Sequence, residues 1–294
     1  MEVEPLQLLP ALLSMALYAR RAQTLRGTPR AVPSWRQWCF HGGALVVALT
    51  LSSPLGALAD ELFWAHMVEH LVIVDLGALL LVLGLTGPVL APVLRVPALA
   101  PLRVLGHPLV ALPLWAVNLG LWHVPVLHEA AVEHDAVHAL QHLLFLATGG
   151  AVWLALLGPL PKPAWFGNGW RLGYIVGVRL AGAVLANVLL FGGGPFYDVY
   201  AAGEASHGLD PQDDQAIAAG IMMVEESVLT ICLFCWLFLK AAREGEERQE
   251  LLDLARARGV ELTDQRAARA VAAGRGAELR RRLEDEHETS ATRA

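Results

Sequence analysis

Residues 63–84 read FWAHMVEHLVIVDLGALLLVLG, an apolar run interrupted by two histidines, one glutamate and one aspartate. A helix of about 20 mostly apolar residues crosses the roughly 30 Å hydrocarbon core of a bilayer. The composition agrees, because 55% of the 294 residues are hydrophobic and only 17% are charged, whereas about a quarter of a typical soluble chain is charged. The run therefore predicts a transmembrane helix in an all-α, polytopic membrane protein.

Other stretches share this length and apolar character, which gives about seven transmembrane helices. They are residues 5–19, 38–57, 63–84, 107–124, 136–157, 172–191 and 215–239. From Lys240 onward the composition changes to 12 basic and 12 acidic residues. We therefore predict a transmembrane domain over 1–239 and a charged, helical tail over 240–294, in which Gly259 ends one helix and Thr263 starts the next.

The basic residues of the membrane domain predict its orientation. Nine of its ten Lys and Arg residues lie in alternate connections between the predicted helices: Arg20, Arg21, Arg26, Arg30, Arg36, Arg95, Arg103, Lys162 and Arg171. Such residues stay in the cytoplasm. The N-terminus is therefore expected outside and the C-terminus in the cytoplasm. The charge pattern shows no basic stripe, so we expect membrane lipid and no nucleic acid as a partner.

This orientation places eight of the eleven histidines at the outer side. His66 and His70 are four residues apart, as are His138 and His142, so each pair shares one face of its helix. With His123 at the outer end of a third helix, they predict a metal site, because imidazole binds zinc, copper, iron and nickel.

Further side chains lie within reach of this predicted site. Additional ligands are offered by Met67, His134, His207, Met222 and Met223. The thioethers of the three methionines would favour Cu(I). A ligating histidine usually donates its second N–H to a neighbouring oxygen, and the candidates for such support are Glu69, Asp135 and Gln141.

A second polar group is predicted near the middle of the bilayer, formed by Asp75, Arg179, Glu225 and Glu226. Ionisable groups at this depth are costly and generally pair or line a functional cavity, so Arg179 is expected to pair with one of the carboxylates. An ion pair and a functional relay remain equally open. Cys232 and Cys235 suggest either an inner-side copper relay or buried apolar residues.

At these residues the chain resembles the membrane-embedded cytochrome c oxidase assembly factor family CtaG, over roughly residues 35–240. The resemblance rests on ordered motifs: His66 to His70, Trp122-His123-Val124-Pro125, Asp135-x-x-His138-x-x-x-His142 with Phe145-Leu146 and Trp153, and Asp214-Gln215 before Gly220-Ile221-Met222. One departure is His128-Glu129, where a Tyr-Asp pair is expected.

The resemblance implies a seven-helix, non-enzymatic protein of the bacterial plasma (inner) membrane that helps to mature haem–copper oxidases. It implies copper as the metal, a haem–copper oxidase subunit as the client, and a periplasmic or extracellular-side copper donor. The copper-handling residues it implies are His66, His70, His123, His138 and His142. Two alternatives remain open from the residues alone: a zinc-dependent hydrolase of a lipid-like substrate, with Glu69 or Asp135 as base, and a membrane cytochrome with a bis-histidine haem.

Overall fold

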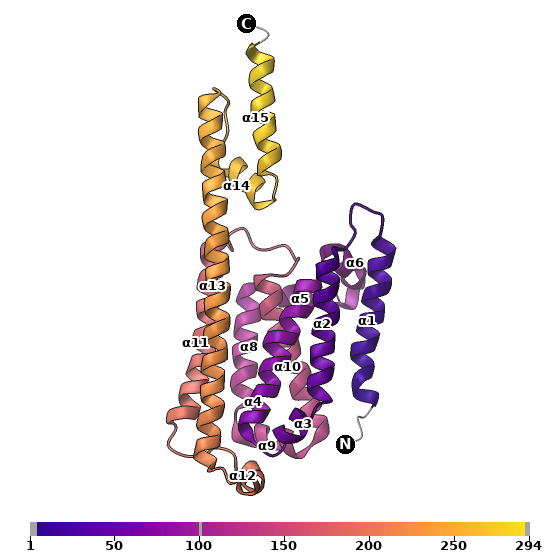
Figure 1. Cartoon of the computed structure of the whole chain (residues 1–294), viewed down its shortest axis with the longest axis vertical. Coiled ribbons are helices and arrows are strands. Elements are labelled where there is room, and N and C mark those ends of the chain that lie inside the picture. Colours follow the sequence, from indigo (N-terminus) through magenta and orange to yellow (C-terminus); the bar gives the residue numbers. More distant parts are fainter. Residues whose placement is uncertain (1–4, 100–101, 292–294) are drawn as a thin grey trace. The chain divides into compact units, whose positions relative to one another are not determined.

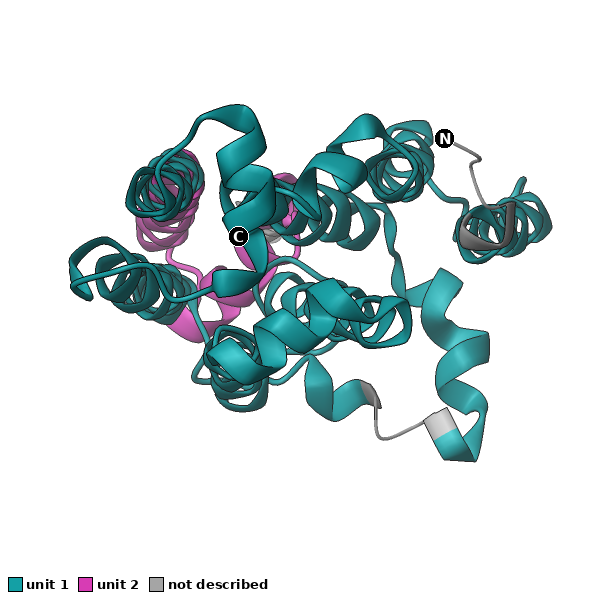
Figure 2. Cartoon of the chain, turned by 90° about the horizontal axis from the view of Figure 1, so that it is seen from below, with its two compact units in different colours: residues 1–230 teal, residues 231–294 magenta. Residues whose placement is uncertain are grey.

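The computed structural model describes residues 5–99 and 102–291, and all secondary structure in these ranges is helical (Figure 1). The elements are α1 Pro5–Leu25, α2 Ser34–Leu51, α3 Pro54–Ala59, α4 Phe63–Leu71, η1 Val72–Gly77, α5 Ala78–Gly84, α6 Gly87–Arg95, η2 Pro97–Leu99, α7 Leu102–Leu105, α8 Pro108–Trp122, α9 Pro125–Glu133, α10 Asp135–Leu156, α11 Asn168–Phe191, η3 Asp198–Tyr200, α12 Ala201–His207, α13 Pro211–Ala257, α14 Asp264–Ala272 and α15 Gly276–Ala291. The chain forms two compact units, residues 1–230 and 231–294 (Figure 2).

Among the described residues, four helical stretches are long and apolar enough to cross a membrane: Phe63–Gly84, Asp135–Leu156, Asn168–Phe191 and Pro211–Ala257. Helices α8 and α9 meet the same criterion together across a 74° bend, which makes five stretches if the bent pair is one span. The chain is therefore a polytopic membrane protein. Helices α1 and α2 coincide with predicted spans but do not meet the criterion, so the number seven and the orientation stay predictions.

Three local features differ from the predicted helices. Helix α2 ends at Leu51 and not at residue 57, because Ser53 caps a separate short helix, α3, that starts with Pro54. The stretch after His123 is helix α9 and not a loop, since Pro125 starts a new helix at an angle to α8. Within the span that carries His66 and His70, residues Val72–Gly77 form a π-helix.

The π-helix lies where α2 and α10 pack against this span. The indole Nε1 of Trp153, on α10, donates a hydrogen bond of 3.0 Å to the carbonyl oxygen of Val74. On the other side, Gly43 of α2 lies so close to the helix that an added Cβ would be 2.8 Å from the carbonyl oxygen of Gly77. Small residues permit such close helix contacts in membranes, and these contacts hold the span that carries the histidines.

The second unit contains the end of α13 together with α14 and α15. Gly259 has a φ of +69°, which suits the left-handed end of a helix, and the Thr263 side chain accepts a hydrogen bond from the Arg266 amide at the start of α14. Both helix boundaries predicted in the tail are thus confirmed. The unit has its own apolar cluster, made of Leu251, Ala255, Val271, Leu279 and Leu283. The predicted domain boundary after residue 239 stays a prediction.

Candidate metal centre

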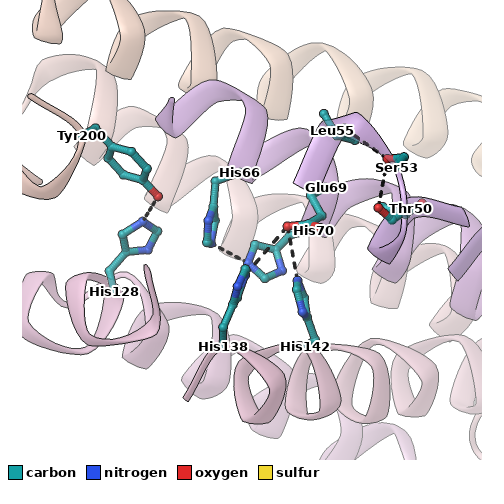
Figure 3. A network of polar contacts seen from close by, with 10 residues as sticks. All are labelled: Thr50, Ser53, Leu55, His66, Glu69, His70, His128, His138, His142 and Tyr200. Carbon is teal, nitrogen blue, oxygen red and sulfur yellow. Dashed lines mark hydrogen bonds and ion pairs between the residues drawn. The ribbon is translucent and has the colours of Figure 1, made fainter. Parts of the chain in front are cut away.

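Two helices bring four histidines together near their first turns. His66 and His70 come from α4, and His138 and His142 come from α10 (Figure 3). The four-residue spacing puts each pair on one helix face, and these faces meet: the His66 and His138 rings stack with centroids 5.1 Å apart, and those of His70 and His142 are 4.9 Å apart.

The ring nitrogens and one carboxylate of this cluster converge. The Nε2 atoms of His66 and His70 are 2.8 Å apart. The carboxylate oxygen Oε2 of Glu69 lies 3.8 Å from Nε2 of His138 and 3.5 Å from Nε2 of His142. Figure 3 shows this oxygen linked to both α10 histidines. The structure thus assembles four imidazoles and a carboxylate in one place.

Within the part of the chain that the structure describes, several of these donor atoms form no hydrogen bond. Oε2 of Glu69 and Nε2 of both His138 and His142 are buried and unpartnered. An unsatisfied buried polar group costs about 1–3 kcal/mol, so natural structures rarely leave three together without a ligand. Imidazole and carboxylate are ligands for zinc and copper, and these residues therefore fit a metal ion.

His123 lies beside this cluster and contacts a sulfur atom. Its Nε2 is 3.4 Å from Sδ of Met67, and its Nδ1 is 2.7 Å from the carbonyl oxygen of Leu119. The hydrogen bond to Leu119 orients the ring, as is usual for metal-binding histidines. Two groups of three residues have donor atoms within 4.8 Å of one another, namely His66, His70 and His138, and Glu69, His138 and His142. His123 and Met67 belong to neither group and form a nitrogen and sulfur pair beside them.

His128 is part of the same neighbourhood, although it was not among the predicted ligands. It is fully buried on α9, and its ring centroid is 4.8 Å from that of His66. Its Nε2 is 2.9 Å from the hydroxyl oxygen of Tyr200. Because burial raises the pKa of Tyr200 well above its usual value of 10, this hydroxyl stays protonated and can donate to His128.

The connection between α11 and α13 lies against the cluster. The Tyr197 hydroxyl donates to the carbonyl oxygen of His123 at 2.9 Å, and Tyr197 and Tyr200 pack against Phe63 at the start of α4. Gln215, on α13, holds this connection, since its side chain bonds the Phe196 amide and the Leu189 and Gly194 carbonyl oxygens. The aromatic side chains of this connection thus lie beside the buried histidines.

A buried carboxylate positions the start of α4. Asp214 is fully buried, and its two oxygens accept hydrogen bonds from the amides of Phe63 and Trp64, at 2.8 and 2.9 Å. Helix α4 has no capping side chain of its own, so Asp214 satisfies amides that the helix leaves unpaired. It lies beside Glu204, and burial, reinforced by Asp214, raises the pKa of Glu204 to about 7.

Other predicted site residues lie apart from the two three-residue groups. His134 and Asp135 are exposed at the start of α10, and His207 is exposed and pairs with Glu61 at 2.8 Å. Met222 is buried in the apolar cluster that contains Met67, and Met223 packs against that cluster. Gln141 is buried, with its Oε1 unpartnered.

The predicted midplane group contains an ion pair. Arg179 on α11 pairs with Glu226 on α13, as expected, and its Nη2 donates to the Ser227 hydroxyl at 3.1 Å. Oε2 of Glu225 is buried without a hydrogen-bond partner. Asp75 lies on the π-helix η1. The arrangement supports the pairing of Arg179 and leaves a relay role as a prediction.

Comparison with known families bears on this geometry. A family model described as cytochrome c oxidase caa3 assembly factor (Caa3_CtaG) matches residues 16–244. The match includes every histidine of the cluster and ends shortly after the charged tail begins. No curated protein and no solved structure matches the chain.

Proposed function

Because the chain belongs to the cytochrome c oxidase caa3 assembly factor family, we propose that it binds copper at the histidine cluster and delivers it to a haem–copper oxidase subunit. The observation that carries this proposal is the convergence of unpartnered donor atoms from Glu69, His138 and His142, next to His66 and His70. Delivery would take place at the bacterial plasma membrane, with copper supplied by a donor on the outer side.

The chemistry of the donors supports copper as the cargo. Imidazole binds copper in both of its common oxidation states, and a thioether favours Cu(I). Sδ of Met67 lies next to Nε2 of His123 at the edge of the cluster, so a soft donor is available close to the imidazoles. In this role copper is a substrate that the protein receives and passes on.

The packing of the rings argues for an ion in preference to a haem. A bis-histidine haem between α4 and α10 would place its macrocycle between an imidazole of each helix. The facing rings of His66 and His138 instead stack with an interplanar angle of 13°, and other imidazoles flank them. The absorption spectrum tests this, since a Soret band in the purified protein would support the haem alternative.

A zinc-dependent hydrolase remains the second candidate, because Glu69, His138 and His142 form a set of two histidines and one carboxylate. Catalytic zinc sites use such sets and keep a further position for water. The membership in an assembly factor family favours the delivery role. Zinc in the natively purified protein, not displaced by copper, would overturn the copper proposal.

The decisive variant is His138→Ala, since His138 belongs to both ligand groups. We expect the wild-type protein to bind copper stoichiometrically, and His138→Ala to lose it and to fail to restore oxidase activity in a strain that lacks the protein. His134→Ala is the matched control, because His134 stands at the N-cap position of α10, four residues before His138, and is exposed. Equal copper content in both variants and the wild type would refute the proposed site.

A further inference from the structure

The cluster contains two groups of three ligands that share one residue. His66, His70 and His138 form the first, and Glu69, His138 and His142 form the second, with the donor atoms of each group within 4.8 Å of one another. We propose that these groups are two alternative positions for one copper ion, which moves between them while His138 stays bound. This inference rests on the proposed function and gives it a route inside the protein.

Distances in the second group approach those of a coordinated ion. Ligand–metal distances of about 2.0–2.2 Å place two donors of a tetrahedral ion roughly 3.4 Å apart. Oε2 of Glu69 is 3.5 Å from Nε2 of His142 and 3.8 Å from Nε2 of His138. Small side-chain rotations are enough to close these distances on an ion, and all three atoms are buried without another partner.

The first group differs in its charge and in its burial. Its donors are imidazoles, and His66 and His70 are both buried, with their Nε2 atoms 2.8 Å apart. An imidazole set binds both copper and zinc, but it gives a divalent ion no compensating charge, whereas the carboxylate of Glu69 supplies a negative charge and a hard oxygen, which favour divalent ions such as Zn²⁺ over Cu(I). The two positions should therefore rank Cu(I) and Zn²⁺ differently.

Sharing of His138 makes the two positions alternatives. A neutral imidazole binds a metal through a single nitrogen lone pair, so Nε2 of His138 serves one ion at a time. Movement then breaks the bonds to His66 and His70 and forms bonds to Glu69 and His142, with no change in oxidation state. Because His142 is one turn further along α10 than His138, the ion advances along the helix axis, by part of a 5.4 Å turn.

The test compares Glu69→Gln, which keeps the shape of the side chain and removes its charge, with His66→Ala. Both proteins are purified at full length and titrated with Cu(I) and separately with Zn²⁺. We expect one Cu(I) per chain in the wild type and in each variant. We expect Glu69→Gln to weaken Zn²⁺ binding about tenfold or more while Cu(I) binding changes little, and His66→Ala to do the reverse.

X-ray absorption of the Cu(I)-loaded proteins reports the ligands directly. Three imidazoles are expected around copper in Glu69→Gln, and two imidazoles with one oxygen in His66→Ala. His138→Ala removes the ligand that both positions share and should bind neither metal. His142→Ala removes the second position by a different substitution and should reproduce the effect of Glu69→Gln, while Glu61→Gln, at an exposed carboxylate, is the control.

Two results would overturn the two-position proposal without touching the proposed function. One is identical metal affinities and spectra in Glu69→Gln and the wild type, since Glu69 would then not be a ligand. The other is two copper ions bound per chain. Absence of any copper binding in the wild type would instead refute the proposed function itself.

Discussion

Removal of the Asp214 carboxylate should destabilise the protein and disturb the histidine cluster together. In Asp214→Ala the amides of Phe63 and Trp64 lose hydrogen bonds of 2.8 and 2.9 Å to a fully buried carboxylate. Loss of a capping side chain costs about 0.5–2 kcal/mol, and hydrogen bonds to charged groups contribute about 1.5–3 kcal/mol each. Relief of the repulsion with Glu204 offsets part of this loss. We expect a net loss of about 2–4 kcal/mol in the free energy of unfolding.

The assay is unfolding of the detergent-solubilised protein at pH 7, combined with Cu(I) titration. Because His66 lies one turn into the helix that Asp214 caps, fraying of that turn should weaken Cu(I) binding as well as stability. Asp214→Asn retains one acceptor oxygen and should recover part of both losses. The matched control is Asp213→Ala, at an exposed neighbour. A stability loss in Asp214→Ala no larger than that in the control would refute the capping role.

Three further predictions concern the packing around the site. Burial raises the pKa of Glu204 from 4.5 to about 7 in the folded protein. Ionisation of Glu204 therefore disfavours the folded state as the pH rises from 4.5 to above 7. Glu204→Gln should raise the melting temperature at pH 8 and not at pH 4. Gly43→Ala should lower the free energy of unfolding by about 1–3 kcal/mol. The added Cβ would lie 2.8 Å from the carbonyl oxygen of Gly77, so the backbone of one of the two helices must move. An unchanged midpoint of urea unfolding would contradict this close packing. Gly203→Ala should loosen α12, because the added Cβ would lie 2.1 Å from the carbonyl oxygen of Glu61. Amide hydrogen exchange over residues 198–207 should become faster, and an unchanged exchange rate would contradict this prediction.

Helical spacing was sufficient to predict which histidines share a helix face. The pairs His66 with His70 and His138 with His142 follow from the four-residue repeat, and the structure brings these pairs together. Glu69 was predicted to support a ligating histidine, although it lies about 100° around an ideal helix from His70. Its flexible side chain nevertheless brings Oε2 to within 3.8 Å of both α10 histidines.

Other parts of the site depend on contacts between distant residues, which periodicity does not report. Asp214 caps a helix that begins about 150 residues earlier in the chain, and Tyr200 meets His128 across a gap of 72 residues. His128 lies on α9, which starts at Pro125 just after the span predicted for residues 107–124, and Pro commonly occupies the first position of a new helix. The apolar residues Val126, Leu127, Ala130, Ala131 and Val132 around His128 are the feature of the sequence that indicates a packed helix there.

The burial of His66 and His70 has a consequence for the rate at which metal would be exchanged under the proposed function. His66 is 0% exposed, and its ring lies beside that of Tyr200, which packs against Phe63. A ligand held in such a place leaves only as fast as the surrounding segments open, and opening of this kind takes microseconds to seconds. Residence time is then governed by the opening rate and not by bond strength alone. If the protein delivers copper as proposed, such a site would retain the ion until the oxidase subunit docks, even though it binds the ion weakly enough to release it afterwards.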